Sequence, residues 1–285
     1  MEWALVAGGA LVGFIVGLTG VGGGSLMTPL LIYGFGVSPH LAVGTDLLFA
    51  AITKSGGALS FAKHRMVPWR IVVPLTVGGL AGVGVMLVFL KTVGPASEHV
   101  HRLMQYTLGV MLLLTAAATL YKVVKSGGVV TPSPSAALDN RGATPAAAHG
   151  RVNSGSAAHT VRDREQPRWA AGPWVMGAVI GALVTLTSVG AGAVGMAILM
   201  VLYPHVPLPR LVAADVTYAV PLTLAAGLGH AALGTVDWAM LGWLLLGSLP
   251  GIWVGSHLVR VVPQRWVRSV LSLLLGGIGA KLLLA

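Results

Sequence analysis

The sequence predicts an all-α polytopic membrane protein made of two inverted-topology repeats, each with a broken or re-entrant glycine-rich helix. Composition, apolar segments and repeated motifs carry this prediction. Of the 285 residues, 55% are hydrophobic and only 9% are charged, against about 25% charged in ordinary soluble domains. Because the chain is so apolar, it is unlike a soluble enzyme, a nucleic-acid-binding protein or a disordered scaffold. Cysteine is absent, which excludes disulfides, thiolate metal sites and a catalytic thiol.

Apolar segments form two sets, and several reach the length of about 20 residues that a membrane-spanning helix needs. The second segment of each set is only about 12 residues long, which is short for a full span. We therefore expect either ten spans of varying length, or six spans with two re-entrant pairs. The segments lie at 3–18, 25–36, 43–62, 71–90 and 103–121, and at 170–186, 192–203, 211–232, 238–259 and 266–284.

A polar stretch separates the two sets. It is rich in Gly, Pro, Ser, Ala and Arg and has no hydrophobic period, so it cannot bury enough apolar surface to fold alone. We divide the chain into a first transmembrane repeat at 1–124, a flexible cytoplasmic linker at 125–168 and a second repeat at 169–285.

The two sets repeat each other at a nearly constant offset of 168 to 169 residues. Thr19–Ser25 aligns with Thr187–Ala193, and Val43–Asp46 aligns with Val212–Asp215. Two further blocks, at 66–69 and 78–82, align in the same way with 235–238 and 247–251. Duplicated halves are typical of secondary transporters, which hold their substrate between the repeats.

Basic residues indicate that the repeats are inverted. In the first half, Lys63, Arg65 and Arg70 flank the connection between the third and fourth segments, whereas the equivalent loop around Asp237 has no Lys or Arg. In the second half, arginines flank the connection between the fourth and fifth segments instead. Positive residues mark cytoplasmic loops, so equivalent loops lie on opposite sides and the linker lies inside.

The glycine elements predict an anion site. Glycine disfavours helix by about 1 kcal/mol relative to Ala, and a broken helix exposes amide groups at a positive dipole end. Irregular backbone inside a membrane must be buried in protein or line a cavity. A close-packing face of small residues is the alternative. The predicted substrate-lining residues here are Thr19, Gly20, Gly22, Gly23, Gly24, Ser25, Thr187, Ser188, Gly190 and Gly192.

Three ionisable residues within the predicted spans extend this site: Asp46, Lys54 and Asp215. Ionisable groups there are costly and usually face a partner or an aqueous path. Asp46 and Asp215 are equivalent in the repeats and follow small residues at what we predict to be helix starts, so N-capping and substrate binding both stay open. Lys54 would attract an anion or form a structural ion pair. His230 and His257 are candidates for a proton relay.

The run from Gly17 to Leu30, Gly-Leu-Thr-Gly-Val-Gly-Gly-Gly-Ser-Leu-Met-Thr-Pro-Leu, followed by Ala-Val-Gly-Thr-Asp at 42–46, resembles the TauE/SafE family of sulfite and organosulfonate exporters. The resemblance covers both halves but not the linker. It implies a multi-pass protein of the bacterial inner membrane, in which Gly20–Ser25, Thr45 and Asp46 line the substrate path. The second motif departs from the pattern, with Ala191 and Ala193 in place of Gly and Ser.

The predicted function is export of a small sulfur-containing oxyanion by alternating access, with no cofactor, no metal and no nucleic-acid partner. Its partners are the anionic substrate and the lipid bilayer, and a homodimer stays open. One alternative is an intramembrane aspartyl protease that uses Asp46 and Asp215, although the Gly-x-Gly-Asp context is missing. The other is a membrane assembly subunit that transports nothing.

Overall fold

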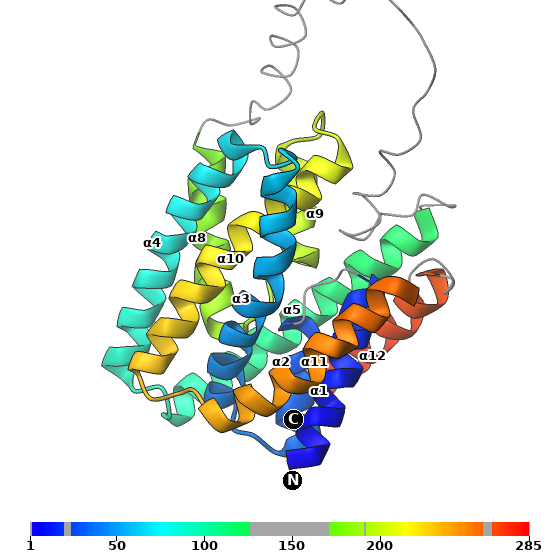
Figure 1. Cartoon of the computed structure of the whole chain (residues 1–285). Coiled ribbons are helices and arrows are strands. Elements are labelled where there is room, and N and C mark those ends of the chain that lie inside the picture. Colours follow the sequence, from blue (N-terminus) through cyan, green and yellow to red (C-terminus); the bar gives the residue numbers. More distant parts are fainter. Residues whose placement is uncertain (1, 20–23, 126–170, 191, 259–263, 285) are drawn as a thin grey trace, which may run out of the picture.

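The structure is a computed structural model that describes residues 2–19, 24–125, 171–190, 192–258 and 264–284 (Figure 1). Its regular elements are all helices within those ranges. The predicted linker, apart from Lys125, lies outside the described residues, as do Gly20, Gly22 and Gly23.

The first half of the chain contains α1 (Glu2–Thr19), α2 (Gly24–Pro29), the π-helical turn η1 (Leu30–Gly34), α3 (Pro39–Lys63), α4 (Trp69–Val93) and α5 (Glu98–Lys125). The second half contains α8 (Gly172–Thr187), α9 (Ala193–Leu202), α10 (Leu208–Ala232), α11 (Trp238–Leu258) and α12 (Gln264–Leu284). The order of long and short helices is the same in both halves.

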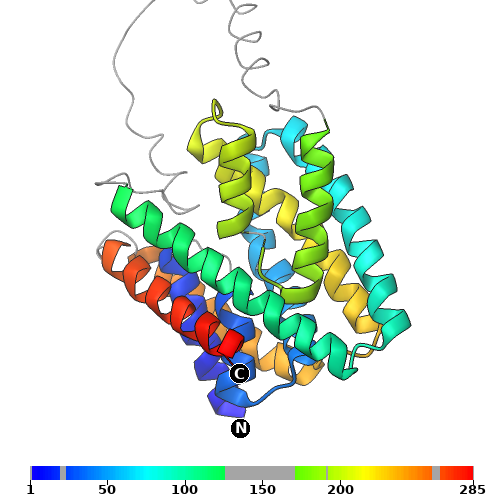
Figure 2. The ribbon, with the colours of Figure 1, turned by 180° about the vertical axis from the view of Figure 1, so that it is seen from behind.

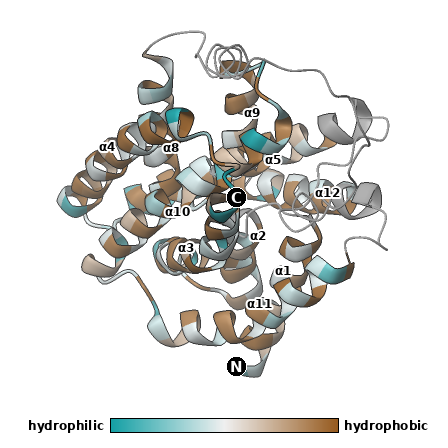
Figure 3. Ribbon diagram, turned by 45° about the horizontal axis from the view of Figure 1, so that its top comes forward, coloured by the Kyte–Doolittle hydropathy of each residue, from teal (hydrophilic) through white to brown (hydrophobic). Residues whose placement is uncertain are grey.

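Four described helices are long and apolar enough to cross a membrane: α4, the Glu98–Leu120 part of α5, α10 and α11. Hydrophobic residues are spread along all the helices (Figure 3), and many point outward. Leu59, Val85 and Leu273 are each more than 70% exposed. Such a surface is stable only against lipid, so the chain is a multi-pass membrane protein.

Every extensive helix contact joins one half of the chain to the other. Helix α1 packs along α11, α4 along α8, α3 along α10, and α5 along α12. Figure 2 shows the last of these pairs from behind, with α5 in green beside α12 in red. One core of buried apolar side chains joins α3, α4, α8, α9 and α10, and another joins α1, α2, α3 and α11. Helix α3 therefore belongs to both cores.

Glycines make two of these contacts very close. A Cβ atom added at Gly13 or Gly17 would overlap the backbone of α11, and one added at Gly82 or Gly181 would overlap backbone across the α4–α8 contact. Spaced four residues apart, glycines let helix backbones approach in a membrane. Much of the glycine in this chain therefore serves helix packing.

Helices α3 and α10 match in detail. Each has 25 residues, and each is followed by a residue with left-handed backbone, Arg65 with φ 53° and Gly234 with φ 72°. Such a residue commonly ends a helix. The two helices lie against each other, so equivalent side chains of the two halves approach the same region.

Candidate functional site

A break in the second half separates α8 from α9. Helix α8 ends at Thr187, and Ser188 follows with φ 56°, a rare value for a residue with a side chain. Gly190 and Gly192 have φ values of 148° and 142°, which only glycine adopts without strain. In the first half, α1 ends at Thr19 and α2 begins at Gly24.

The Asp46 carboxyl group lies opposite this break. Asp46 is fully buried, and the Thr28 hydroxyl of α2 donates a hydrogen bond to its Oδ2. Ser188, itself only 3% exposed, lies beside the same carboxyl group. Among the described residues, neither Asp46 Oδ1 nor Ser188 Oγ has a hydrogen-bond partner. These two buried polar atoms, one from each half, therefore lie beside each other with no other partner among the described residues.

Asp215 occupies the equivalent place in the second half. Its Oδ1 accepts a hydrogen bond of 3.1 Å from the Tyr218 hydroxyl. A Cβ atom built on Gly195, in the first turn of α9, would lie 2.7 Å from the same Oδ1. The carboxyl group thus sits against the positive end of α9, where negative charge is favoured.

Lys54 links the two acids electrostatically. The residue as a whole is half-buried, and its ammonium group lies within electrostatic range of Asp215 and, more weakly, of Asp46. With all three groups charged, the cluster would carry one net negative charge. The lysine therefore balances internal carboxylates, as the ion-pair alternative expects.

The expectation that Asp46 and Asp215 begin helices is wrong. Each is the eighth residue of its helix, and the N-cap residues are Ser38 and Pro207. The small residues before Asp46 serve packing instead, because a Cβ atom on Gly44 would overlap the Thr235 carbonyl oxygen. Neither aspartate caps its own helix, and each faces the short helix α2 or α9.

Two predicted site hydroxyls are used within the protein. Thr45 is fully buried and accepts a 3.1 Å hydrogen bond from the Asp237 amide. The Thr187 hydroxyl is 2.7 Å from both the Leu183 and the Val189 carbonyl oxygens, so it shapes the break. Gly24 begins α2, and Gly192 directly precedes α9; the side chains of Thr19 and Ser25 lie outside the described features.

The structure adds three residues that the sequence reasoning missed: Thr28, Tyr218 and Gly195. Tyr218 lies three residues after Asp215, and this spacing places two side chains together on a helix. The contact between the two residues could therefore have been predicted from the sequence. Thr28 lies within the glycine-rich run, but its contact with Asp46 spans 18 residues and depends on the fold. No sequence pattern identifies Gly195. Its role is to leave space for the Asp215 carboxyl group, which a side chain at this position would fill.

Both histidines proposed for proton relay have local partners. The ring nitrogens of His230 lie 2.8 Å from Thr235 Oγ1 and 3.0 Å from the Thr185 carbonyl oxygen. His257 is exposed, and its Nδ1 lies 2.8 Å from the Trp253 carbonyl oxygen. No group of three or more His, Asp or Glu side chains suited to a metal ion occurs in the described part of the chain.

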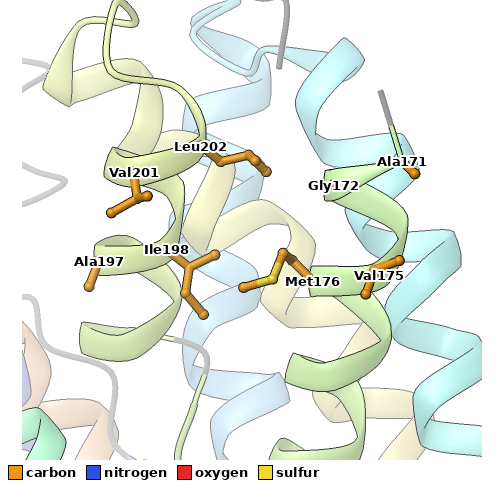
Figure 4. A pocket seen from close by; sticks show the side chains of 8 residues that line it. All are labelled: Ala171, Gly172, Val175, Met176, Ala197, Ile198, Val201 and Leu202. Atoms are coloured by element: carbon orange, nitrogen blue, oxygen red, sulfur yellow. The ribbon is translucent and has the colours of Figure 1, made fainter. Parts of the chain in front are cut away.

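A separate cavity of about 620 Å³ lies between α8 and α9. Figure 4 shows its lining side chains, all without charge or hydrogen-bonding groups. They are Ala171, Gly172, Val175, Met176, Ala197, Ile198, Val201 and Leu202. An apolar groove of this kind suits hydrocarbon and not an ion, so the polar cluster is the candidate transport site.

Comparison with known proteins agrees with a transporter. The family model described as sulfite exporter TauE/SafE matches residues 5–282. The probable membrane transporter protein YjnA of Bacillus subtilis (strain 168) is 30% identical over 291 residues, covering 99% of this chain and 100% of the relative. YdhB of the same organism, also named a probable membrane transporter protein, is 26% identical over 92% of each chain. No solved structure matches significantly.

The match extends over nearly the whole chain and includes the glycine-rich run and both buried aspartates. Its relatives are named probable membrane transporter proteins, which supports a transporter over the protease alternative. The chain therefore belongs to the sulfite exporter TauE/SafE family, and it is a multi-pass membrane transporter of a small molecule, not an enzyme.

Proposed function

We propose that this transporter exports a small sulfur-containing oxyanion, such as sulfite or a sulfonate, through the cluster of Asp46, Lys54, Ser188 and Asp215. The observation that carries this proposal is the pair of buried polar atoms at the α8–α9 break, Asp46 Oδ1 and Ser188 Oγ, which have no partner but each other among the described residues. Buried polar atoms are nearly always paired in native proteins. A buried hydroxyl and carboxyl group with so few partners, within electrostatic range of Lys54, can take a further hydrogen bond from or to a polar ligand.

The surroundings favour an oxyanion over a neutral solute. Lys54 supplies a positive charge and Ser188 supplies a hydroxyl donor, while the positive end of α9 is shared with the Asp215 carboxyl group. Oxyanions have several acceptor oxygens, so they can accept hydrogen bonds from both the Lys54 ammonium group and the Ser188 hydroxyl. The family description, sulfite exporter, points to the same class of substrate.

We further infer that the halves form inverted repeats that rock against each other. A two-fold relation exchanges α1 with α8 and α4 with α11, so it converts the α1–α11 contact into the α8–α4 contact. It also pairs α3 with its equivalent α10, and α5 with its equivalent α12. All four contacts are present, and the switch of basic residues between equivalent loops supports inversion.

Alternating access would then open the cluster to each side of the membrane in turn. The short helices α2 and α9, which begin after the glycine elements, would belong to broken or re-entrant segments that carry the site. A negative cell interior favours exit of an anion by about 2.3 kcal/mol per charge per 100 mV. Export therefore needs no further driving force for a substrate that is concentrated inside.

The test is ligand-dependent thermal stability of the purified protein with sulfite, sulfate, thiosulfate, taurine, sulfoacetate and chloride. We expect selective stabilisation by sulfite or a sulfonate. Lys54→Met should weaken that binding at least tenfold, or about 1.4 kcal/mol. The matched control Lys91→Met, on the exposed end of α4, should bind as the wild type does.

Because Lys54→Met removes a cation that interacts with Asp215, it can also lower stability. Ser188→Ala is therefore a second variant, since it removes the hydroxyl without changing charge. Preference for neutral or cationic ligands, or unchanged anion binding in both variants, would refute the proposed site.

A further inference from the structure

We propose that His40 and His101 form a binding site for a divalent transition-metal ion such as Zn²⁺, which joins α3 to α5. The two residues lie 61 positions apart in the chain, and the fold brings their rings together. Neither residue belongs to the polar cluster at the α8–α9 break. The site is therefore additional to the proposed function and does not depend on it.

The two rings come from different helix pairs. His40 lies in the first turn of α3, which packs along α10, and His101 lies in the first turn of α5, which packs along α12. Both side chains are half-buried, so solvent still reaches the site. With the linker on the inner side, as the basic loops indicate, these two first turns lie on the outer side of the membrane.

The distances between the rings fit a shared metal ion. His40 Nδ1 lies 3.3 Å from His101 Nε2, and the ring centres are 5.1 Å apart. Two histidine nitrogens bound to zinc at about 2.0–2.1 Å with a tetrahedral angle are about 3.3–3.4 Å apart. Because the metal lies on the outward axis of each ring nitrogen, the two ring centres are then about 5 Å apart. Both observed distances agree with one ion held between the rings.

A direct hydrogen bond between the rings is the alternative. At 3.3 Å the contact is longer than the distance of about 2.9–3.0 Å that is typical of N–H···O hydrogen bonds. Such a bond uses one proton and one lone pair, whereas a metal ion replaces the proton and uses both lone pairs. The two nitrogens can therefore hold either a proton or a metal ion between them.

The surroundings favour the neutral rings that bind metals. Two protonated rings at this distance would repel each other. Each ring also lies in a first helical turn, where the positive dipole end disfavours a charged imidazole. Ser38 Oγ lies 3.5 Å from His40 Nε2. Acceptance of the Nε2 hydrogen by this oxygen would leave the Nδ1 lone pair for the ion, as in other histidine metal sites.

The remaining ligands of the ion would be water molecules. Within the described ranges, no third His, Asp or Glu side chain joins the pair to form a larger cluster. His99 is exposed and lies two residues before His101, so it points to another side of α5. Glu98 is paired with Arg102. Structural zinc sites use four protein ligands, so an ion held by two histidines and water exchanges readily with the medium.

The first experiment titrates Zn²⁺ into the purified full-length protein, without a histidine tag, in competition with a fluorescent zinc indicator. The wild type should bind one more ion per chain than His40→Ala or His101→Ala, or bind it at least ten times more tightly. Zinc should also raise the melting temperature of the wild type more than that of either variant, because an ion that binds only the folded protein stabilises it. His99→Ala, an exposed change in the same turn of α5, is the matched control and should behave as the wild type does.

The second experiment needs no variant. Diethyl pyrocarbonate modifies accessible histidine rings, and mass spectrometry reads each modified position. Zinc should slow the modification of His40 and His101 in the wild type and leave that of His99 unchanged. Equal zinc binding by the wild type and both alanine variants, or modification of the pair at the same rate with and without zinc, would overturn the site. Neither result bears on anion binding in the thermal panel, which tests the proposed function separately.

Discussion

The glycine contact between α4 and α8 allows a quantitative test with two changes on one helix. A Cβ atom at Gly82 would overlap the Ala178 carbonyl oxygen of α8, whereas nothing lies within 4 Å of a Cβ atom at Gly84. Ala raises helix propensity equally in both variants, by about 1 kcal/mol, so this contribution cancels in the comparison. The overlap at Gly82 forces two backbones apart, and such overpacking costs about 1–3 kcal/mol.

Gly82→Ala should therefore be about 1–3 kcal/mol less stable than Gly84→Ala. At about 2–4 °C per kcal/mol, its melting temperature should lie about 2–12 °C lower. The assay is thermal unfolding of both purified variants in the same detergent, followed by tryptophan fluorescence. Equal melting temperatures would mean that α4 and α8 do not pack through these glycines. The packing of first-half helices against second-half helices would then be refuted at this contact.

Two further variants test the polar cluster itself. Thr28→Val removes the donor to the buried Asp46 carboxyl group and should cost about 1–3 kcal/mol of stability, whereas the exposed Thr92→Val should cost little; equal melting temperatures would contradict the contact. Gly195→Ala pushes a methyl group into the space of the Asp215 carboxyl group and should weaken sulfite binding at least tenfold in a titration. Gly242→Ala, with open space around it, is its control, and equal affinities would place the anion elsewhere.

The apolar segments could be predicted from the sequence because hydropathy along the chain is a local pattern. The segment predicted at 71–90 lies within α4, which spans Trp69–Val93, and the segment at 211–232 lies within α10. The nearly constant offset between the blocks agrees with the equal length of α3 and α10, 25 residues each. These features depend on hydropathy and spacing, which tertiary contacts do not alter.

The arrangement of the site depends on contacts between distant residues, and there the sequence was ambiguous. Small residues before Asp46 suggested a helix start, but they allow close approach to the loop before α11. The glycines of α1 and those of the following element look alike in the sequence, although Gly13 and Gly17 lie in an unbroken helix. Only the atoms around a glycine in the folded structure show whether it packs against another helix or ends its own helix.

The exchange of helix partners has a consequence for biosynthesis. Helix α1 is made first, but the surface that fits its glycines belongs to α11, which leaves the ribosome more than 200 residues later. Until α11 is made, the newly inserted α1 must contact lipid or an insertion factor in place of α11. Neither half of the gene, expressed by itself, would supply both helices of the α1–α11 contact. The two fragments made in the same cell should assemble.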